Sequence, residues 1–210
     1  MELGNPFKVV TPTVDGAVLG VLAGATAEFT PPEIQRLLGR YSVDGVRKAL
    51  VRLTDQGIVL RHGPGNASLY RLNRDHLAAP AIIELARTKQ RLLVSLQTQV
   101  AGWKRPCAYG AVFGSAARDS MRADSDIDLF VVRPRQVTDD EEVWAQQLLD
   151  LARSVHSWTG NDARILEYGA DELDGGTTSR DPVLSAVRQE GLRFAGPSNY
   201  LRKAEKAGAG

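Results

Sequence analysis

Apolar residues recur with helical spacing in the first part of the chain and in strand-like runs in the second, which divides the chain near residue 75. An almost wholly apolar segment, TVDGAVLGVLAGA, starts at Thr13 and predicts a core helix. Capping signals at Thr30 and Ser42 predict two further helices, the second with one apolar and one basic face. Two strand-like pieces then surround the turn-rich HGPGNAS, so residues 1–75 are expected to form three helices and a hairpin.

A long amphipathic helix is predicted between the two halves, within residues 76–104. The segment from Pro80 to Trp103 has no glycine until near its end, and its apolar residues recur at helical spacing. This helix is expected to connect two domains. Two roles stay open for its apolar face: packing against the second domain, or forming the seam of a homodimer.

The second domain is expected to span residues 105–197. One stretch of it departs from the apolar pattern. In VFGSAARDSMRADSDIDLFVV, a short apolar strand ends at Gly114 and Ser115, where a helix starts. Such a corner turns backbone amides and a hydroxyl outward at the positive end of a helix dipole. The Gly-Ser step therefore predicts an anion site.

Two carboxylates follow at the entry of the next strand, SDIDLFVV. Asp126 and Asp128 share one strand face, about 6.6 Å apart, because alternate residues of a strand point to the same side. Ionised carboxylates at this separation repel each other in a partly dry site, and a divalent cation reverses that repulsion. Mg²⁺ or Mn²⁺ on these carboxylates, with the phosphates of an NTP at the Gly-Ser corner, forms a coherent metal-triphosphate site.

The combined stretch GSAARDSMRADSDIDLFVV resembles the signature of the DNA polymerase beta-like nucleotidyltransferase superfamily, especially its minimal members. The resembling positions are Gly114, Ser115, Arg118, Ser125, Asp126 and Asp128. The resemblance implies a mixed sheet flanked by helices, with nucleotide contacts from the first four of these residues. It implies metal binding and catalysis by the two aspartates. It also implies transfer of a nucleoside monophosphate from an NTP, with ATP the expected nucleotide, to a hydroxyl of a protein, an RNA or a small molecule.

The sequence departs from this family at the third carboxylate, which members usually supply from a later strand. That strand is expected to be ARILEY, and it places Arg164 where the third aspartate is expected. An arginine neutralises phosphate charge but is neither a base nor a metal ligand at neutral pH. Two interpretations stay open: either Asp162 or Glu167 reaches the site after a shift in strand register, or the domain binds nucleotide and has lost efficient transfer.

Residues 11–75 resemble the winged helix-turn-helix domain of bacterial regulators in the order of their predicted elements. The resemblance implies that the helix after Ser42 enters the major groove of DNA. The expected DNA-binding residues are Ser42, Arg47, Lys48, Arg52 and Arg61. Phosphate contacts by the basic residues imply an affinity that depends on salt. The alternative is that this basic face is only solvated, or that the domain binds a protein.

Composition limits the class of protein. The 210 residues have a formal net charge of +1, which argues against a globally basic coat for nucleic acid. Cys107 is the only cysteine and cannot form an intrachain disulfide. The apolar runs are far shorter than the ~20 residues that span a bilayer, so we expect a cytoplasmic protein without a membrane partner. Residues 198–210 are expected to be disordered.

These observations predict an α+β protein that binds DNA through its first domain and Mg-NTP through its second. The leading hypothesis is that the second domain transfers a nucleoside monophosphate. The alternative is a non-catalytic winged-helix transcriptional regulator whose degenerate nucleotidyltransferase domain senses nucleotide or a partner. A toxin-like or antitoxin-like module is a third hypothesis, because minimal nucleotidyltransferases occur in such systems.

Overall fold

The computed structural model describes residues 1–63, 68–174 and 181–201 of the chain. These residues fold into two compact units. The first contains Glu2 and residues 4–89, and the second contains Met1, Leu3 and the chain from Gln90 onward. Helices and strands occur in both units, which confirms the α+β class. Among the described residues, no helix is long and apolar enough to cross a membrane.

The first unit has the predicted order of helices and hairpin. Its elements are η1 (Pro6–Val9), α1 (Val14–Gly24), α2 (Pro31–Leu38), α3 (Val43–Asp55), β1 (Val59–His62), β2 (Leu69–Leu72) and α4 (Ala79–Ala86). The capping signals act as expected, because the Thr30 hydroxyl caps α2 within a full capping box and the Ser42 hydroxyl accepts from the Gly45 amide. β1 and β2 pair antiparallel, and Phe29 bridges to Tyr70 of β2. Residues 64–67, within the predicted turn, lie outside the described residues.

The segment predicted as one long helix is instead two helices. α4 ends at Ala86, and α5 (Thr88–Ala101) begins after Arg87. The Thr88 hydroxyl donates to the Leu85 carbonyl at 2.6 Å, a local bond that competes with the regular helical pattern. Apolar periodicity runs through this interruption unchanged, which is why the sequence predicted a continuous helix. The homodimer seam stays a prediction.

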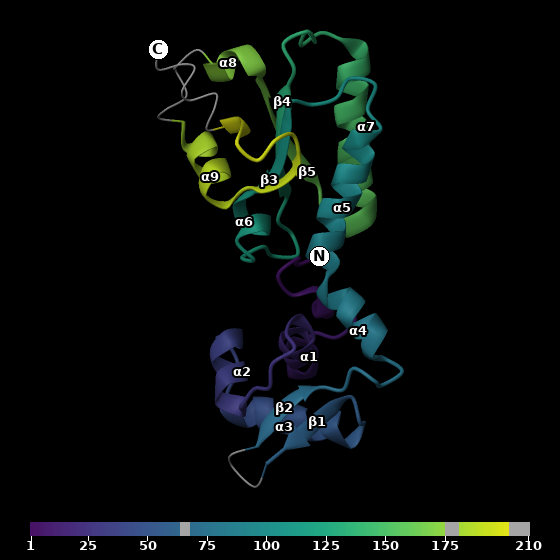
Figure 1. Ribbon diagram of the computed structural model, residues 1–210, viewed down its shortest axis with the longest axis vertical. Coiled ribbons are helices and arrows are strands. Elements are labelled where there is room, and N and C mark those ends of the chain that lie inside the picture. Colours follow the sequence, from purple (N-terminus) through teal and green to yellow (C-terminus); the bar gives the residue numbers. More distant parts are fainter. Residues whose placement is uncertain (64–67, 175–180, 202–210) are drawn as a thin grey trace. The chain divides into compact units, whose positions relative to one another are not determined.

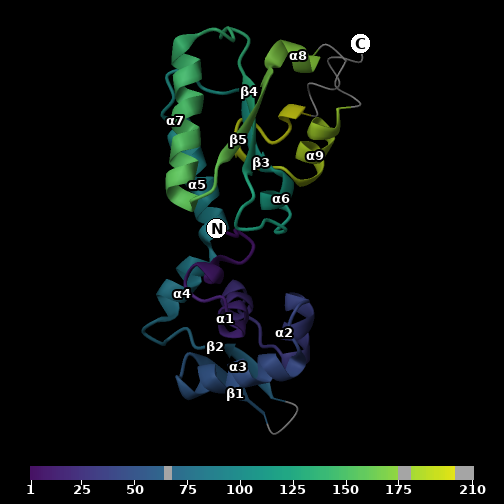
Figure 2. The ribbon, with the colours of Figure 1, turned by 180° about the vertical axis from the view of Figure 1, so that it is seen from behind.

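The second unit is built on a four-stranded mixed sheet. Its elements after α5 are β3 (Tyr109–Phe113), α6 (Gly114–Ala117), β4 (Ile127–Arg133), α7 (Glu142–Thr159), β5 (Ala163–Gly169), α8 (Ala170–Asp174), α9 (Pro182–Glu190) and β6 (Leu192–Ala195). The strand order is β5-β4-β3-β6, with β3 antiparallel to β4 and β6, and β4 parallel to β5. Helices α5 and α7 lie on one side of the sheet, and α8 and α9 on the other (Figures 1 and 2).

Strand β4 is buried between two apolar clusters. Ile127 and Leu129 join the cluster formed with α5 and α7, whereas Phe130 and Val132 join the cluster formed with α8 and α9. Since alternate residues share a face, Asp128 belongs to the α8 and α9 side, at the start of the strand. The sheet therefore places this carboxylate at the edge of a core rather than on an open surface.

The segment after β6 is partly packed, which corrects the prediction of disorder from residue 198. Tyr200 stacks on Tyr109 with ring centroids 5.6 Å apart, and Leu201 is buried in the α8 and α9 cluster. This apolar contact with the sheet outweighs the polar character of the segment. The rest of the predicted tail, residues 202–210, lies outside the described residues.

Candidate functional site

The Gly-Ser corner and the second aspartate meet across two strands. Phe113, the last residue of β3, is the partner of Asp128 on β4. Gly114 follows with a φ of +68°, and a Cβ at this position would come within 2.5 Å of Asp128 Oδ2. Glycine is required here both by its backbone angle and by the carboxylate that lies against it. The sheet register thus unites two residues that are fourteen positions apart in the sequence.

The electrostatic environment of Asp128 combines partial burial with charges of both signs. Partial burial raises the pKa of this carboxyl above its ordinary value, and the neighbouring Asp126 raises it further. The guanidinium groups of Arg164 and Arg118 act in the opposite direction and lower it. The ionised form of Asp128 is therefore disfavoured by burial and stabilised by the two neighbouring guanidinium groups.

Asp126 and Ser125 lie just before β4. Asp126 is exposed, and no hydrogen bond or ion pair holds its side chain within the described part of the chain. The Ser125 hydroxyl accepts from the Arg122 amide at 3.0 Å, which closes a local turn. Ser125 was predicted to bind nucleotide, and here its hydroxyl stabilises the loop that leads to Asp126.

The anion-binding corner already holds a carboxylate from elsewhere in the chain. Glu190, the last residue of α9, accepts from the Gly114 amide at 3.2 Å, and Arg118 donates to the same oxygen. The Ser115 hydroxyl has no polar partner among the residues described. Helix α6 is a single turn, so its dipole adds little and the amide and guanidinium donors define the corner.

Arg164 stands at the position where the third carboxylate was sought. In the parallel pairing of β4 and β5, Arg164 is the partner of Asp128. The two residues therefore share one face of the sheet, and Leu166, the next residue on that face of β5, packs in the same cluster as Phe130. The alignment inferred from the sequence agrees with this register.

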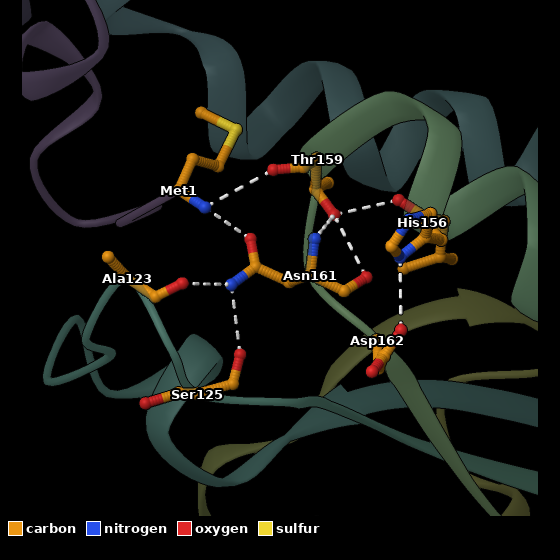
Figure 3. A network of polar contacts seen from close by, with 8 residues as sticks. Met1, Ala123, Ser125, His156, Thr159, Asn161 and Asp162 are labelled. Atoms are coloured by element: carbon orange, nitrogen blue, oxygen red, sulfur yellow. Dashed lines mark hydrogen bonds and ion pairs between the residues drawn. The ribbon is translucent and has the colours of Figure 1, made fainter.

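The two alternative carboxylates point elsewhere. Glu167 accepts from the Arg133 guanidinium at 2.7 Å and from the Trp144 indole of α7 at 2.9 Å, on the opposite face of the sheet from Asp128. Asp162 is exposed and lies 3.0 Å from the His156 ring of α7 (Figure 3). A shift in strand register that would bring either one to the site is therefore not observed.

The residues present fit one divalent cation carried by a nucleotide. Among the described residues no cluster of three or more His, Cys, Asp or Glu side chains has the arrangement of a metal site. Mg²⁺, however, binds through one or two protein carboxylates and completes its coordination with water and substrate phosphates. Asp126 and Asp128 supply such a pair beside the Gly114 corner.

The comparison with known families concerns the same segment. Residues 109–164 match the family described as "Nucleotidyltransferase domain". The second unit contains a nucleotidyltransferase domain. The match starts at the first residue of β3, covers the corner and both aspartates, and ends at Arg164.

Two solved structures are similar to part of the chain. One is described as a crystal structure of a toxin-antitoxin with AMP-PNP; the chains are 16% identical, with 58% of this chain and 83% of that chain covered and a TM-score of 0.38. The other is a mutant of the toxin-antitoxin MntA-HpeT, 15% identical, with the same coverage and a TM-score of 0.37. No curated protein matches the chain.

The predicted DNA-binding residues of the first unit differ in their surroundings. Arg47 and Lys48 are exposed on α3, where Lys48 pairs with Asp44 one turn earlier at 2.9 Å. Arg52 makes a bidentate pair with Asp15 of α1. Arg61 donates to the Ser68 hydroxyl at 2.8 Å, and Ser42 caps α3. All five residues are therefore exposed, and within the described part of the chain each of them except Arg47 has a side-chain contact inside the unit.

Two residues that lie close to the candidate site were not identified from the sequence. Glu190 comes to the Gly114 amide from the far end of α9. Asn161 is buried between α7 and β5, and its side chain reaches the loop before Asp126. Neither belongs to a short motif, because each acts through a contact between distant segments, and their residue types alone give no signal.

Proposed function

We propose that the second unit binds a nucleoside triphosphate with Mg²⁺ or Mn²⁺ and transfers its nucleoside monophosphate to an acceptor hydroxyl. The observation that carries the proposal is the Asp128 carboxylate lying against Gly114, with Asp126 two residues before it. Hydrogen-bond donors for phosphate and two carboxylates suited to a metal ion therefore lie together at one corner of the sheet. The proposed nucleotide is ATP.

The residues of the chain act mainly by positioning and by neutralising charge. The Gly114 amide and Arg118 would hold phosphate oxygens, and Asp126 and Asp128 would hold the divalent cation. The bound cation supplies Lewis-acid stabilisation of charge on the phosphates. The acceptor oxygen forms a bond to the α-phosphorus, the bond to the β-phosphate oxygen breaks, and pyrophosphate leaves with that electron pair. The hydroxyl proton passes to solvent.

Arg164 favours an alternative proposal, in which the domain binds nucleotide without transferring it. Its guanidinium beside Asp128 neutralises charge but accepts no proton at neutral pH. In this case the protein is a winged-helix transcriptional regulator with a nucleotide-sensing domain. Nucleotide binding is common to both proposals, and only transfer separates them.

The test compares labelling by the wild type and two variants. Wild type, Asp126→Ala/Asp128→Ala and Glu167→Gln are each incubated with α-labelled NTPs, Mg²⁺ or Mn²⁺, and cell extract. Glu167→Gln is the matched control because it removes a carboxylate on the other face of the sheet. We expect label from wild type and Glu167→Gln only. Equal labelling by all three would refute transfer, and absence of label with intact nucleotide binding would favour the non-catalytic alternative.

We propose DNA binding by the first unit as a second function. The supporting observation is that Arg47 and Lys48 are exposed on α3, which precedes the β1–β2 hairpin. Binding of promoter DNA is measured by fluorescence anisotropy across a salt series. We expect Arg47→Ala/Lys48→Ala to weaken binding and to reduce the salt slope by roughly 1–2. The matched control is Lys89→Ala, which removes a lysine of α5 rather than of α3, and equal binding by the double variant and wild type would contradict the assignment.

A further inference from the structure

A buried amide side chain holds the loop that carries Asp126. Asn161 is only 3% exposed, and its Nδ2 donates to the carbonyls of Ala123 at 2.8 Å and of Ser125 at 3.0 Å (Figure 3). Its Oδ1 accepts from the Met1 ammonium group. Both amide hydrogens and the amide oxygen are thereby satisfied inside the protein.

The end of α7 determines where this amide lies. Gly160 ends the helix in the left-handed region, with a φ of +71°, and donates its amide to the His156 carbonyl. The buried Thr159 hydroxyl then accepts from the Asn161 amide at 3.1 Å and donates to the Val155 carbonyl at 2.7 Å. The chain therefore leaves the helix in one defined direction, with Asn161 turned towards the loop.

The main chain on both sides of Asp126 is attached to two consecutive residues. Before it, the Ser125 carbonyl accepts from the Asn161 side chain, and after it, the Ile127 amide donates to the Asp162 carbonyl at 2.8 Å. The Asp126 side chain itself has no polar partner in the part of the chain that the structure describes. The position of its carboxylate thus depends on these two main-chain attachments.

Only a primary amide fulfils the role of Asn161 at this position. Its two N–H bonds diverge in one plane from a single nitrogen and reach two carbonyls that lie two residues apart. An aspartate of the same shape has no such donors, and alanine leaves both carbonyls without their partner. Loss of a buried donor leaves the loop free to move, because Ala123 is exposed and the hydrogen bonds between Arg122 and Ser125 lie within the loop itself.

We propose that Asn161 is a positioning residue for the metal site, acting through the loop on Asp126. The inference rests on the proposed function, since it assigns to Asp126 the binding of a cation. Residues behind a metal ligand commonly contribute 10–100-fold in metal affinity. We therefore expect loss of Asn161 to weaken cation binding in the presence of nucleotide, with a smaller effect on the fold.

The experiment measures Mn²⁺ binding to the full chain in the presence of a non-hydrolysable ATP analogue. Wild type, Asn161→Ala and Asn161→Ser are compared with Asp162→Asn, a change at the neighbouring residue, whose exposed side chain has His156 as its only polar partner among the described residues. We expect a dissociation constant for Mn²⁺ roughly tenfold higher in both Asn161 variants, and within twofold of wild type in Asp162→Asn. The melting temperature of each variant is recorded, and binding is measured well below it.

The outcomes distinguish this inference from the proposed function. If wild type binds no Mn²⁺ with the nucleotide analogue, the proposed function fails. If wild type binds and both Asn161 variants bind equally well, the proposed function stands and the positioning role is wrong. Loss of cooperative melting in both Asn161 variants would also overturn it, because Asn161 would then hold the fold rather than the loop. Transfer assays add a second readout. We expect the Asn161 variants to need a higher Mn²⁺ concentration than wild type for half-maximal transfer, with an unchanged rate at saturating Mn²⁺.

Discussion

Asp128 and Arg164 are partners across the parallel strands β4 and β5, so a guanidinium stands beside the carboxylate that lies against Gly114. Arg164 lowers the pKa of Asp128, in opposition to burial, which raises it. The same positive charge that stabilises the carboxylate opposes the approach of a free cation and attracts phosphate. Arg164 should therefore affect the affinity for a free metal ion and the affinity for a nucleotide in opposite directions, and both affinities can be measured.

We expect Arg164→Ala to have opposite effects on two ligands. Binding of Mn²⁺ alone should tighten by roughly three- to tenfold, because a positive charge next to Asp128 is removed. Binding of free NTP should weaken by a similar factor, since phosphate loses that charge. Isothermal titration with each ligand separately checks both effects. Arg153→Ala, on the exposed side of α7, is the matched control, and a change of the same sign for both ligands would contradict the expectation.

Gly114→Ala should destabilise the second unit and displace Asp128. The added Cβ meets Asp128 Oδ2 at 2.5 Å, and the φ of +68° strains any residue other than glycine. Together these effects predict a loss of about 1–3 kcal/mol in the free energy of unfolding. Urea denaturation measures it. Gly24→Ala is the control, because its Cβ would meet nothing within 4 Å at the end of α1, and we expect it to be neutral or stabilising.

Glu190→Gln should increase the affinity for NTP. The Glu190 carboxylate accepts from the Gly114 amide and pairs with Arg118, two of the groups proposed to hold phosphate. Arg118 holds the pKa of Glu190 below its ordinary value, so the competitor is ionised at neutral pH. Removing the charge should lower the dissociation constant roughly two- to fivefold, as measured by nucleotide titration. Glu142→Gln serves as control, and an unchanged or weaker affinity in Glu190→Gln would show that Glu190 does not compete.

Asp15 should stabilise the first unit at neutral pH but not at strongly acidic pH. Its hydrogen bonds with Arg52 hold the pKa of Asp15 below the ordinary 3.8. A carboxyl whose folded pKa is depressed stabilises the fold above the unfolded pKa, and that contribution is lost as the pH falls through the folded pKa. We expect Asp15→Asn to lower the melting temperature by roughly 1–3 °C at neutral pH.

The pH series gives this prediction its control. The difference between wild type and Asp15→Asn should be constant from neutral pH down to about pH 4–5, should shrink as the pH falls below the ordinary pKa of 3.8, and should vanish only below the lower pKa of the folded state. Asp55→Asn, on the exposed face of α3, removes a carboxyl that has no ion pair among the described residues. A difference that grows as the pH falls would contradict the assigned role of the Asp15–Arg52 pair.

Much of the local structure could be predicted from short segments. Thr30 and Ser42 mark the starts of α2 and α3, because a capping side chain acts on amides only two or three residues away. The interruption at Arg87 and the packing of Tyr200 could not be predicted in the same way. The first depends on a local hydrogen bond within a continuous apolar pattern, and the second on a stacking partner, Tyr109, from another part of the chain.

The residue types and spacing of the candidate site, from the Gly114 corner to Asp126 and Asp128, could be read from a short segment, because strand alternation and glycine conformation are local properties. The groups that surround these residues depend on the fold. Arg164 stands opposite Asp128, Glu190 reaches the corner, and Asn161 holds the loop before Asp126. Each of these contacts follows from strand register and helix packing between distant segments, where one residue's shift exchanges the two faces of a strand.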